Sequence, residues 1–80
     1  MKILHLAYNP FLKNYVLVDG KDVRTGRRIE VGKLESGKLD EFIGLKRKST
    51  LYIDGQVPEE DYRRLEEKYS GTKINLVREK

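Results

Sequence analysis

Side chains follow a period of two in two short stretches of the chain: Leu4, Leu6 and Tyr8 recur at every second position of residues 2–8, and polar and apolar side chains alternate at residues 28–31. A period of two places successive side chains on opposite faces of a strand, so both stretches are predicted to be β-strands. Residues 15–18 are β-branched and aromatic and end at the turn signal Asp19-Gly20, which predicts a further strand between them. Asn9-Pro10 turns the chain after residues 2–8, and the strand at residues 15–18 follows closely, so an antiparallel hairpin of these two strands is expected. One face of its first strand carries Leu4, Leu6 and Tyr8.

Further along the chain, the apolar spacing changes to three and four residues, which is the period of a helix face. Leu39, Phe42 and Ile43 follow this spacing and predict a short helix with all three side chains on its buried face. Ser36 is its expected N-cap, because a hydroxyl at this position accepts a hydrogen bond from the first turn. Gly44 is expected to end the helix.

A second helix is predicted to begin at Pro58, because proline suits the first helical turn and acidic residues follow it. Ser70-Gly71 marks its end. The buried stripe of this helix is expected to consist of Tyr62, Leu65 and Tyr69. Strands are predicted on either side of it, at residues 50–53 and 73–77. The continuous apolar run at residues 50–53 indicates a central strand that is covered on both faces.

The predicted order is therefore a hairpin, a short third strand, a helix, a strand, a helix and a strand. This order indicates an α+β fold in which helices cover one face of a small mixed sheet, and a ubiquitin-like β-grasp is one variant of it. Residues 1–80 are expected to form a single small domain, because a domain usually takes about 100–200 residues.

Composition narrows the class of protein. The chain has no cysteine and no apolar run near the roughly 20 residues that a membrane helix needs. We therefore expect a cytoplasmic protein without a membrane partner. His5 is the only histidine, which predicts a structural or surface role and no metal site. No set of catalytic residues is visible, so neither an enzymatic activity nor a cofactor is expected.

The net charge is +4, and two predicted loops contain most of the positive excess. Basic loops favour a phosphate-bearing ligand or an acidic protein surface. The candidate contact residues in these loops are Lys21, Arg24, Arg27, Arg28, Lys46, Arg47 and Lys48. Phe11 and Tyr15 flank the first turn and are the aromatic residues expected to be exposed, so we select them as candidate anchors at an interface.

The segment from Gly32 to Lys38 has the glycine and lysine spacing of a P-loop, G-x-x-x-x-G-K. Leu39 stands where that motif needs a hydroxyl for magnesium, so the match is incomplete. A lysine-rich turn before a capped helix explains the same residues. Nucleotide binding at this segment is therefore kept only as a remote alternative.

Turn and helix-start motifs along the chain give it a resemblance to a known module. The motifs are Tyr8-Asn9-Pro10-Phe11, Leu17-Val18-Asp19-Gly20-Lys21-Asp22-Val23, Ile53-Asp54-Gly55 and Glu60-Asp61-Tyr62 followed by Leu65. Together they resemble a small α+β module with a YNPY start and a DGK turn, found at the N-terminus of bacterial GTPase-like and mobile-element proteins. The resemblance implies a recognition or docking role and carries over no catalytic residue.

The leading hypothesis from the sequence is a non-enzymatic module that binds another protein, as an adaptor, an inhibitor or a subunit. It would use the basic loops and a sheet edge, and self-association through such an edge is a close variant. The alternative is a nucleic-acid-binding protein that contacts phosphates through residues 21–28 and 46–48.

Overall fold

Five strands form one mixed sheet in the residues that the computed structural model describes, which are 2–34, 37–43 and 48–79. The strands are β1 (Lys2–Asn9), β2 (Asn14–Asp19), β3 (Arg27–Gly32), β4 (Ser49–Ile53) and β5 (Ile74–Arg78). Their order across the sheet is β3-β2-β1-β4-β5. The pairs β1–β2 and β2–β3 are antiparallel, whereas β1–β4 and β4–β5 are parallel. All five predicted strands are therefore present, including the short third one.

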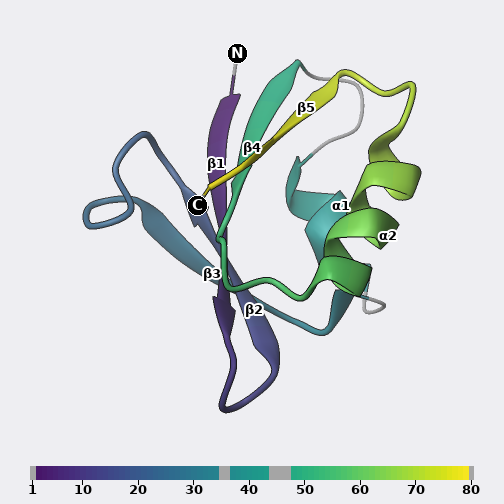
Figure 1. Cartoon of the computed structure of the whole chain (residues 1–80). Coiled ribbons are helices and arrows are strands. Elements are labelled where there is room, and N and C mark those ends of the chain that lie inside the picture. Colours follow the sequence, from purple (N-terminus) through teal and green to yellow (C-terminus); the bar gives the residue numbers. More distant parts are fainter. Residues whose placement is uncertain (1, 35–36, 44–47, 80) are drawn as a thin grey trace.

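Two helices in the described residues, α1 (Lys38–Ile43) and α2 (Glu59–Tyr69), lie on the same side of the sheet (Figure 1). α1 lies on the connection from β3 to β4, and α2 lies on the connection from β4 to β5. The predicted α+β class, with a mixed sheet and helices on one face, is confirmed. A ubiquitin-like hairpin would lead directly into the first helix, whereas here β3 extends the hairpin to three antiparallel strands.

The core lies between the two helices and the sheet face that they cover. Its main side chains are Leu4, Leu6, Leu17, Leu51 and Ile53 from the sheet and Leu39, Ile43, Leu65 and Tyr69 from the helices. Each fully buried aliphatic side chain contributes about 1.5–3 kcal/mol by leaving water. Phe42 was predicted to join this core, but it is 37% exposed. In a helix of six residues, the i and i+4 positions Leu39 and Ile43 face the sheet, and Phe42 points away from their shared direction.

α2 begins one residue later than predicted, since Pro58 is its N-cap residue and Glu59 its first helical residue, and the predicted acidic residues lie in its first turn. Glu59 lies in this turn, and its carboxylate is 3.8 Å from the Arg63 side chain and 2.5 Å from the Arg78 side chain of β5. The helix ends at Ser70, followed by Gly71 with φ of 75°. The predicted Ser36 cap and the Gly44 terminator of α1 lie outside the described residues.

The opposite face of the sheet has no helix over it in the described residues (Figure 1). The strand registers place Val18, His5, Tyr52 and Val77 in one row across this face. β4 is central because it pairs with both β1 and β5, as predicted. Helices cover only one of its faces, however, and on the other face Tyr52 is half-buried.

Candidate binding surfaces

The turn between β1 and β2 carries the two most exposed large apolar side chains of the described residues, since Phe11 is 94% and Leu12 is 70% exposed. Asn9 fixes this turn, because its Oδ1 accepts hydrogen bonds from the backbone N–H of Phe11 at 2.9 Å and of Leu12 at 3.2 Å. Lys13 follows in a left-handed conformation with φ of 53°. The turn therefore presents both apolar side chains to solvent on a defined backbone.

Tyr15 does not belong to this exposed tip, so its prediction as an exposed anchor is wrong. It is only 3% exposed, and its hydroxyl donates a 2.6 Å hydrogen bond to Oδ2 of Asp61 at the start of α2. Its ring lies against Tyr8, with the ring centroids 4.8 Å apart. The antiparallel register places Tyr15 opposite Tyr8 on the helix-covered face, so Tyr15 is a core residue with a satisfied hydroxyl.

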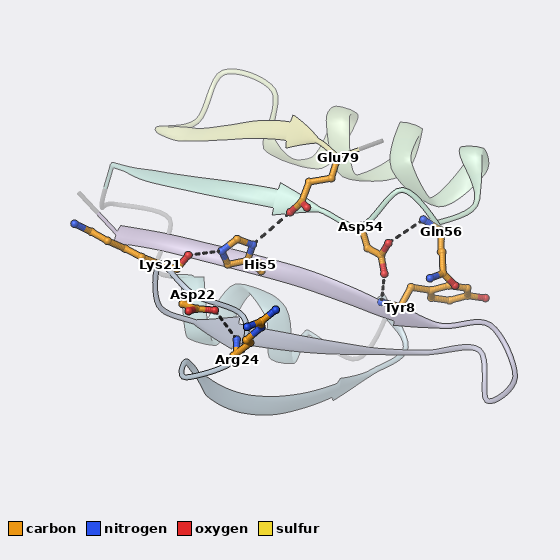
Figure 2. Close-up of polar contacts among 8 residues, drawn as sticks. All are labelled: His5, Tyr8, Lys21, Asp22, Arg24, Asp54, Gln56 and Glu79. Carbon is orange, nitrogen blue, oxygen red and sulfur yellow. Dashed lines mark hydrogen bonds and ion pairs between the residues drawn. The ribbon is translucent and has the colours of Figure 1, made fainter.

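The loop between β2 and β3, residues 20–26, folds over the sheet face opposite the helices. Asp22 organises it, because its Oδ1 accepts a hydrogen bond from the Arg24 N–H at 2.9 Å (Figure 2). The carbonyl oxygen of Asp22 also accepts a hydrogen bond from the Gly26 N–H at 2.9 Å. Gly26 packs against Val18 so closely that a Cβ atom would lie 2.5 Å from the valine Cγ1. The loop is thus fixed by backbone contacts, and its long side chains remain on the outside.

The structure brings most of the predicted basic residues to one end of the sheet. Gly20 donates a backbone hydrogen bond to Ile3, and Lys2 donates one to Lys48, so the loop and the start of β4 both adjoin the start of β1. We call this surface the basic end, and its exposed residues are Lys21, Arg24, Arg27, Arg28, Lys48 and Lys73. The predicted candidates Lys46 and Arg47 lie outside the described residues.

Lys73 also belongs to the basic end, although it is not among the basic contact residues predicted from the sequence. Its carbonyl oxygen accepts a hydrogen bond from the backbone N–H of Ser49 at 3.2 Å, which places it beside Lys48. No local signal reveals this, because the two lysines are 25 positions apart (73 − 48) and meet only through the parallel β4–β5 pairing. Lys2 also lies at this end, where its Nζ is 3.7 Å from the Asp19 carboxylate.

Phe11 and the basic end lie at opposite ends of the sheet. The β1–β2 turn follows the end of β1, whereas the basic end adjoins its start. The contact residues that the sequence suggested therefore form two separate surfaces, an apolar tip at Phe11 and Leu12 and the basic end.

His5 links three segments on the face opposite the helices (Figure 2). Its Nε2 lies 3.2 Å from the carbonyl oxygen of Lys21, and its Nδ1 lies 3.3 Å from Oε1 of Glu79. Its ring stacks on Tyr52, with the ring centroids 5.1 Å apart. These partners hold the β2–β3 loop and the end of the chain against the sheet, which is a structural role. The sequence could not name them, because Lys21 and Glu79 are 16 and 74 residues away.

A hollow of about 580 Å³ lies beyond the ends of β4 and β5 and is lined by Asp54, Gly55, Gln56, Arg78 and Glu79. The Asp54 carboxylate is already used within the protein, since it accepts hydrogen bonds from the backbone N–H of Tyr8 at 3.4 Å and of Gln56 at 3.0 Å (Figure 2). The described residues contain no group of three or more side chains that could hold a metal ion.

Two of the carboxylate contacts shift a pKa. Burial, reinforced by the hydrogen bond that its hydroxyl donates to Asp40 at 2.8 Å, raises the pKa of Tyr69 well above its usual value. The hydrogen bond and charge of Arg78 lower the pKa of the exposed Glu59 carboxyl. The first contact joins α2 to α1, and the second joins α2 to β5. Both therefore stabilise the packing of α2.

The P-loop-like segment connects β3 to α1. Gly32 and Gly37 have φ of 74° and 78°, and the motif residues Glu35 and Ser36 lie outside the described residues. A P-loop site also uses an aspartate that follows an apolar strand and faces the metal, and Asp54 after β4 is the residue of this chain in such a position. β2 and β1 lie between β3 and β4, so Asp54 is not beside this segment in the sheet. The arrangement gives nucleotide binding no added support.

A comparison with protein-family models, curated proteins and solved structures finds no match. The resemblance to the YNPY module therefore remains a prediction. No helix in the described part of the chain is long and apolar enough to cross a membrane.

Proposed function

We propose that the chain is a non-catalytic module that docks onto another protein, as an adaptor, an inhibitor or a subunit. The observation that carries this proposal is the apolar tip, where Phe11 and Leu12 are adjacent and largely exposed. Aromatic side chains are enriched in protein interfaces, and contiguous exposed apolar groups mark interaction sites. The partner would offer an apolar pocket to the tip.

The backbone of the tip favours binding. Asn9 already holds the N–H groups of Phe11 and Leu12, so docking orders little additional backbone. Burial of each of the two side chains in a partner would contribute about 1.5–3 kcal/mol. A rigid turn with two apolar side chains is therefore an efficient anchor.

The test is capture of partner proteins by the immobilised chain, compared with a Phe11→Ser/Leu12→Ser variant. The matched control is Val23→Ser, because Val23 is also an exposed apolar residue, at 40%, but lies in the β2–β3 loop at the other end. We expect the tip variant to lose partners that the control retains, with both variants folded by circular dichroism. Equal capture by the tip variant and the control would contradict the proposal.

Nucleic-acid binding is the second candidate function, and the gathering of six exposed basic side chains at one end favours it. Phosphate contacts release counterions, so such binding weakens by about 10³–10⁵ between 50 and 200 mM salt when six to ten phosphates are engaged. A mobility-shift assay with single- and double-stranded probes tests this. No retention at low salt would eliminate the candidate, and loss of retention in Lys21→Ala/Lys48→Ala would support it.

We place the protein in the cytoplasm as part of this proposal. The absence of cysteine supports a reducing compartment, where disulfides are rare. Fractionation of cells that express a tagged chain tests the location, and recovery of the chain in an oxidising compartment would contradict it.

A further inference from the structure

The sheet has two edge strands, β3 and β5, and their outer edges differ in protection. The β3 edge follows a register shift at Tyr15/Val16 and carries Arg27, Arg28 and Glu30. Irregular pairing and charged side chains are common devices that keep an edge from pairing with another chain. β5 pairs with β4 in a continuous register, and its residues Ile74, Asn75, Leu76 and Val77 carry no charge. β5 is therefore the less protected edge.

The hydrogen bonds of β5 show which backbone groups face outward. The Lys73 carbonyl accepts a hydrogen bond from the Ser49 N–H at 3.2 Å, and the Glu79 N–H donates one to the Ile53 carbonyl at 2.8 Å. The backbone groups of residues 73 and 79 therefore point toward β4. Successive residues of a strand alternate between its two sides. The backbone N–H and C=O groups of residues 75 and 77 therefore also point toward β4, whereas those of Ile74, Leu76 and Arg78 point outward, away from the sheet. The Ile74 N–H lies 3.3 Å from Thr72 Oγ1, a weak local acceptor at the start of the strand.

We infer that β5 pairs with β5 of a second copy of the chain, antiparallel and centred on Leu76. In this register the outward backbone N–H and C=O groups of one copy meet those of the other, because Leu76 lies opposite Leu76 of the second copy and Ile74 lies opposite its Arg78. The same register places Lys73 opposite Glu79 of the second copy, twice by symmetry. Opposite charges in directly facing cross-strand positions are favourable.

Charge selects this register over its neighbours. A centre at Asn75 would place Lys73 opposite Val77, and a centre at Val77 would place Glu79 opposite Asn75. Neither forms the two Lys–Glu pairs. Lys73 and Glu79 also share the sheet face of His5, because Glu79 contacts His5 and the two residues are an even number of positions apart. Their side chains can therefore meet on that face.

The inference goes beyond the proposed docking function, because the apolar tip lies on the β1–β2 turn and stays accessible in such a dimer. The interface is isologous, in that the same strand serves both subunits, which closes the assembly at two copies. Edge pairing also satisfies backbone groups of a sheet that is only five strands wide.

Sedimentation of the full chain from micromolar to millimolar concentration tests the dimer. Lys73→Glu replaces two attractive pairs with two repulsive ones, so the dimer should dissociate about tenfold more readily. Lys73→Glu/Glu79→Lys restores opposite charges and should recover association. Lys33→Glu makes the same charge change at an exposed lysine away from β5 and serves as the control. A chain that stays monomeric at millimolar concentration, or an equal effect of Lys33→Glu, would overturn the inference.

Amide hydrogen exchange gives an independent readout of the register. The N–H groups of Leu76 and Arg78 should become protected as concentration rises, whereas those of Asn75 and Val77 should be protected at every concentration, because they face β4. This alternation is specific to pairing along the β5 edge. Concentration-dependent protection of β3 instead, or protection without alternation, would show a different interface and refute the β5 register.

Discussion

Gly26 occupies a position where space, and not backbone conformation, excludes a side chain. A Cβ atom there would lie 2.5 Å from Val18 Cγ1 and 3.0 Å from the Asp19 carbonyl oxygen. We predict that Gly26→Ala destabilises the protein by about 1–3 kcal/mol, because the loop or Val18 must shift to relieve the overlap. Denaturant unfolding measures this change.

Gly71→Ala is the matched comparison for Gly26→Ala. A Cβ atom at Gly71 would meet open space, but the residue has a φ of +75°, so the cost comes from the left-handed backbone alone, about 1 kcal/mol. If Gly26→Ala is no more costly than a surface substitution, the close packing of the β2–β3 loop on Val18 is refuted.

Tyr69 gives a pH-dependent prediction at the residue scale. Its pKa is raised in the folded state, mainly by burial and then by the hydrogen bond to Asp40. The contribution of the Tyr69 hydroxyl to the free energy of unfolding is therefore complete below the unfolded pKa of 10.0 and declines as the pH rises above that value. We expect Tyr69→Phe to cost about 1.5–3 kcal/mol at neutral pH, as for a hydrogen bond to a carboxylate. The difference between the two proteins should shrink above pH 10 in unfolding experiments. A difference that stays constant with pH would contradict this assignment.

At the scale of elements, the β1–β2 turn depends on one side chain. Asn9→Ala removes the acceptor of both the Phe11 and Leu12 N–H groups, and we predict a loss of about 1 kcal/mol in the free energy of unfolding. Amide exchange at Phe11 and Leu12 should accelerate. Asn75→Ala, at an exposed position of β5, is the control and should change stability by no more than about 0.5 kcal/mol. Equal effects of the two variants would mean that Asn9 does not fix the turn.

The elements themselves follow closely from the sequence, since the five strands and two helices lie where alternation, proline and glycine predict them. The errors concern which face a residue occupies. Phe42 satisfies the helical spacing but is exposed, because a helix as short as α1 buries only Leu39 and Ile43. Tyr15 follows a turn and was predicted to be exposed, yet strand register places it in the core opposite Tyr8. Spacing along one element does not show which side its neighbours cover.

At the scale of the whole molecule, β1 joins the antiparallel and parallel halves of the sheet, since it pairs with both β2 and β4. The interior strands β1 and β4 also carry fully buried leucines, Leu4 and Leu51. We predict that the amides of these two strands exchange most slowly, at the rate of global unfolding, and that the outward amides of the edge strand β3 exchange faster than those of β1 and β4. Native-state hydrogen exchange measures this order. Faster exchange in β1 than in β3 would contradict the central role of β1.

The candidate surfaces are also a property of the whole molecule. The sequence supplied their residue types, such as the basic runs and Phe11, and exposure of Phe11 is confirmed. It did not show that these residues lie at opposite ends of the sheet, or that Lys73 lies beside Lys48. The His5 contacts with Lys21 and Glu79 were equally hidden, because each joins residues far apart in the chain.

The amino-acid sequence by itself determined the class of fold, the succession of strands and helices and the side chains available for binding, because local periodicity and turn chemistry act over a few residues. Tertiary structure alone decided the strand order, the face on which each aromatic ring lies and the separation of the apolar tip from the basic end. Those features depend on pairings between distant segments, which are selected by the burial of one shared core. The spacing of apolar residues within a single strand or helix does not show these pairings.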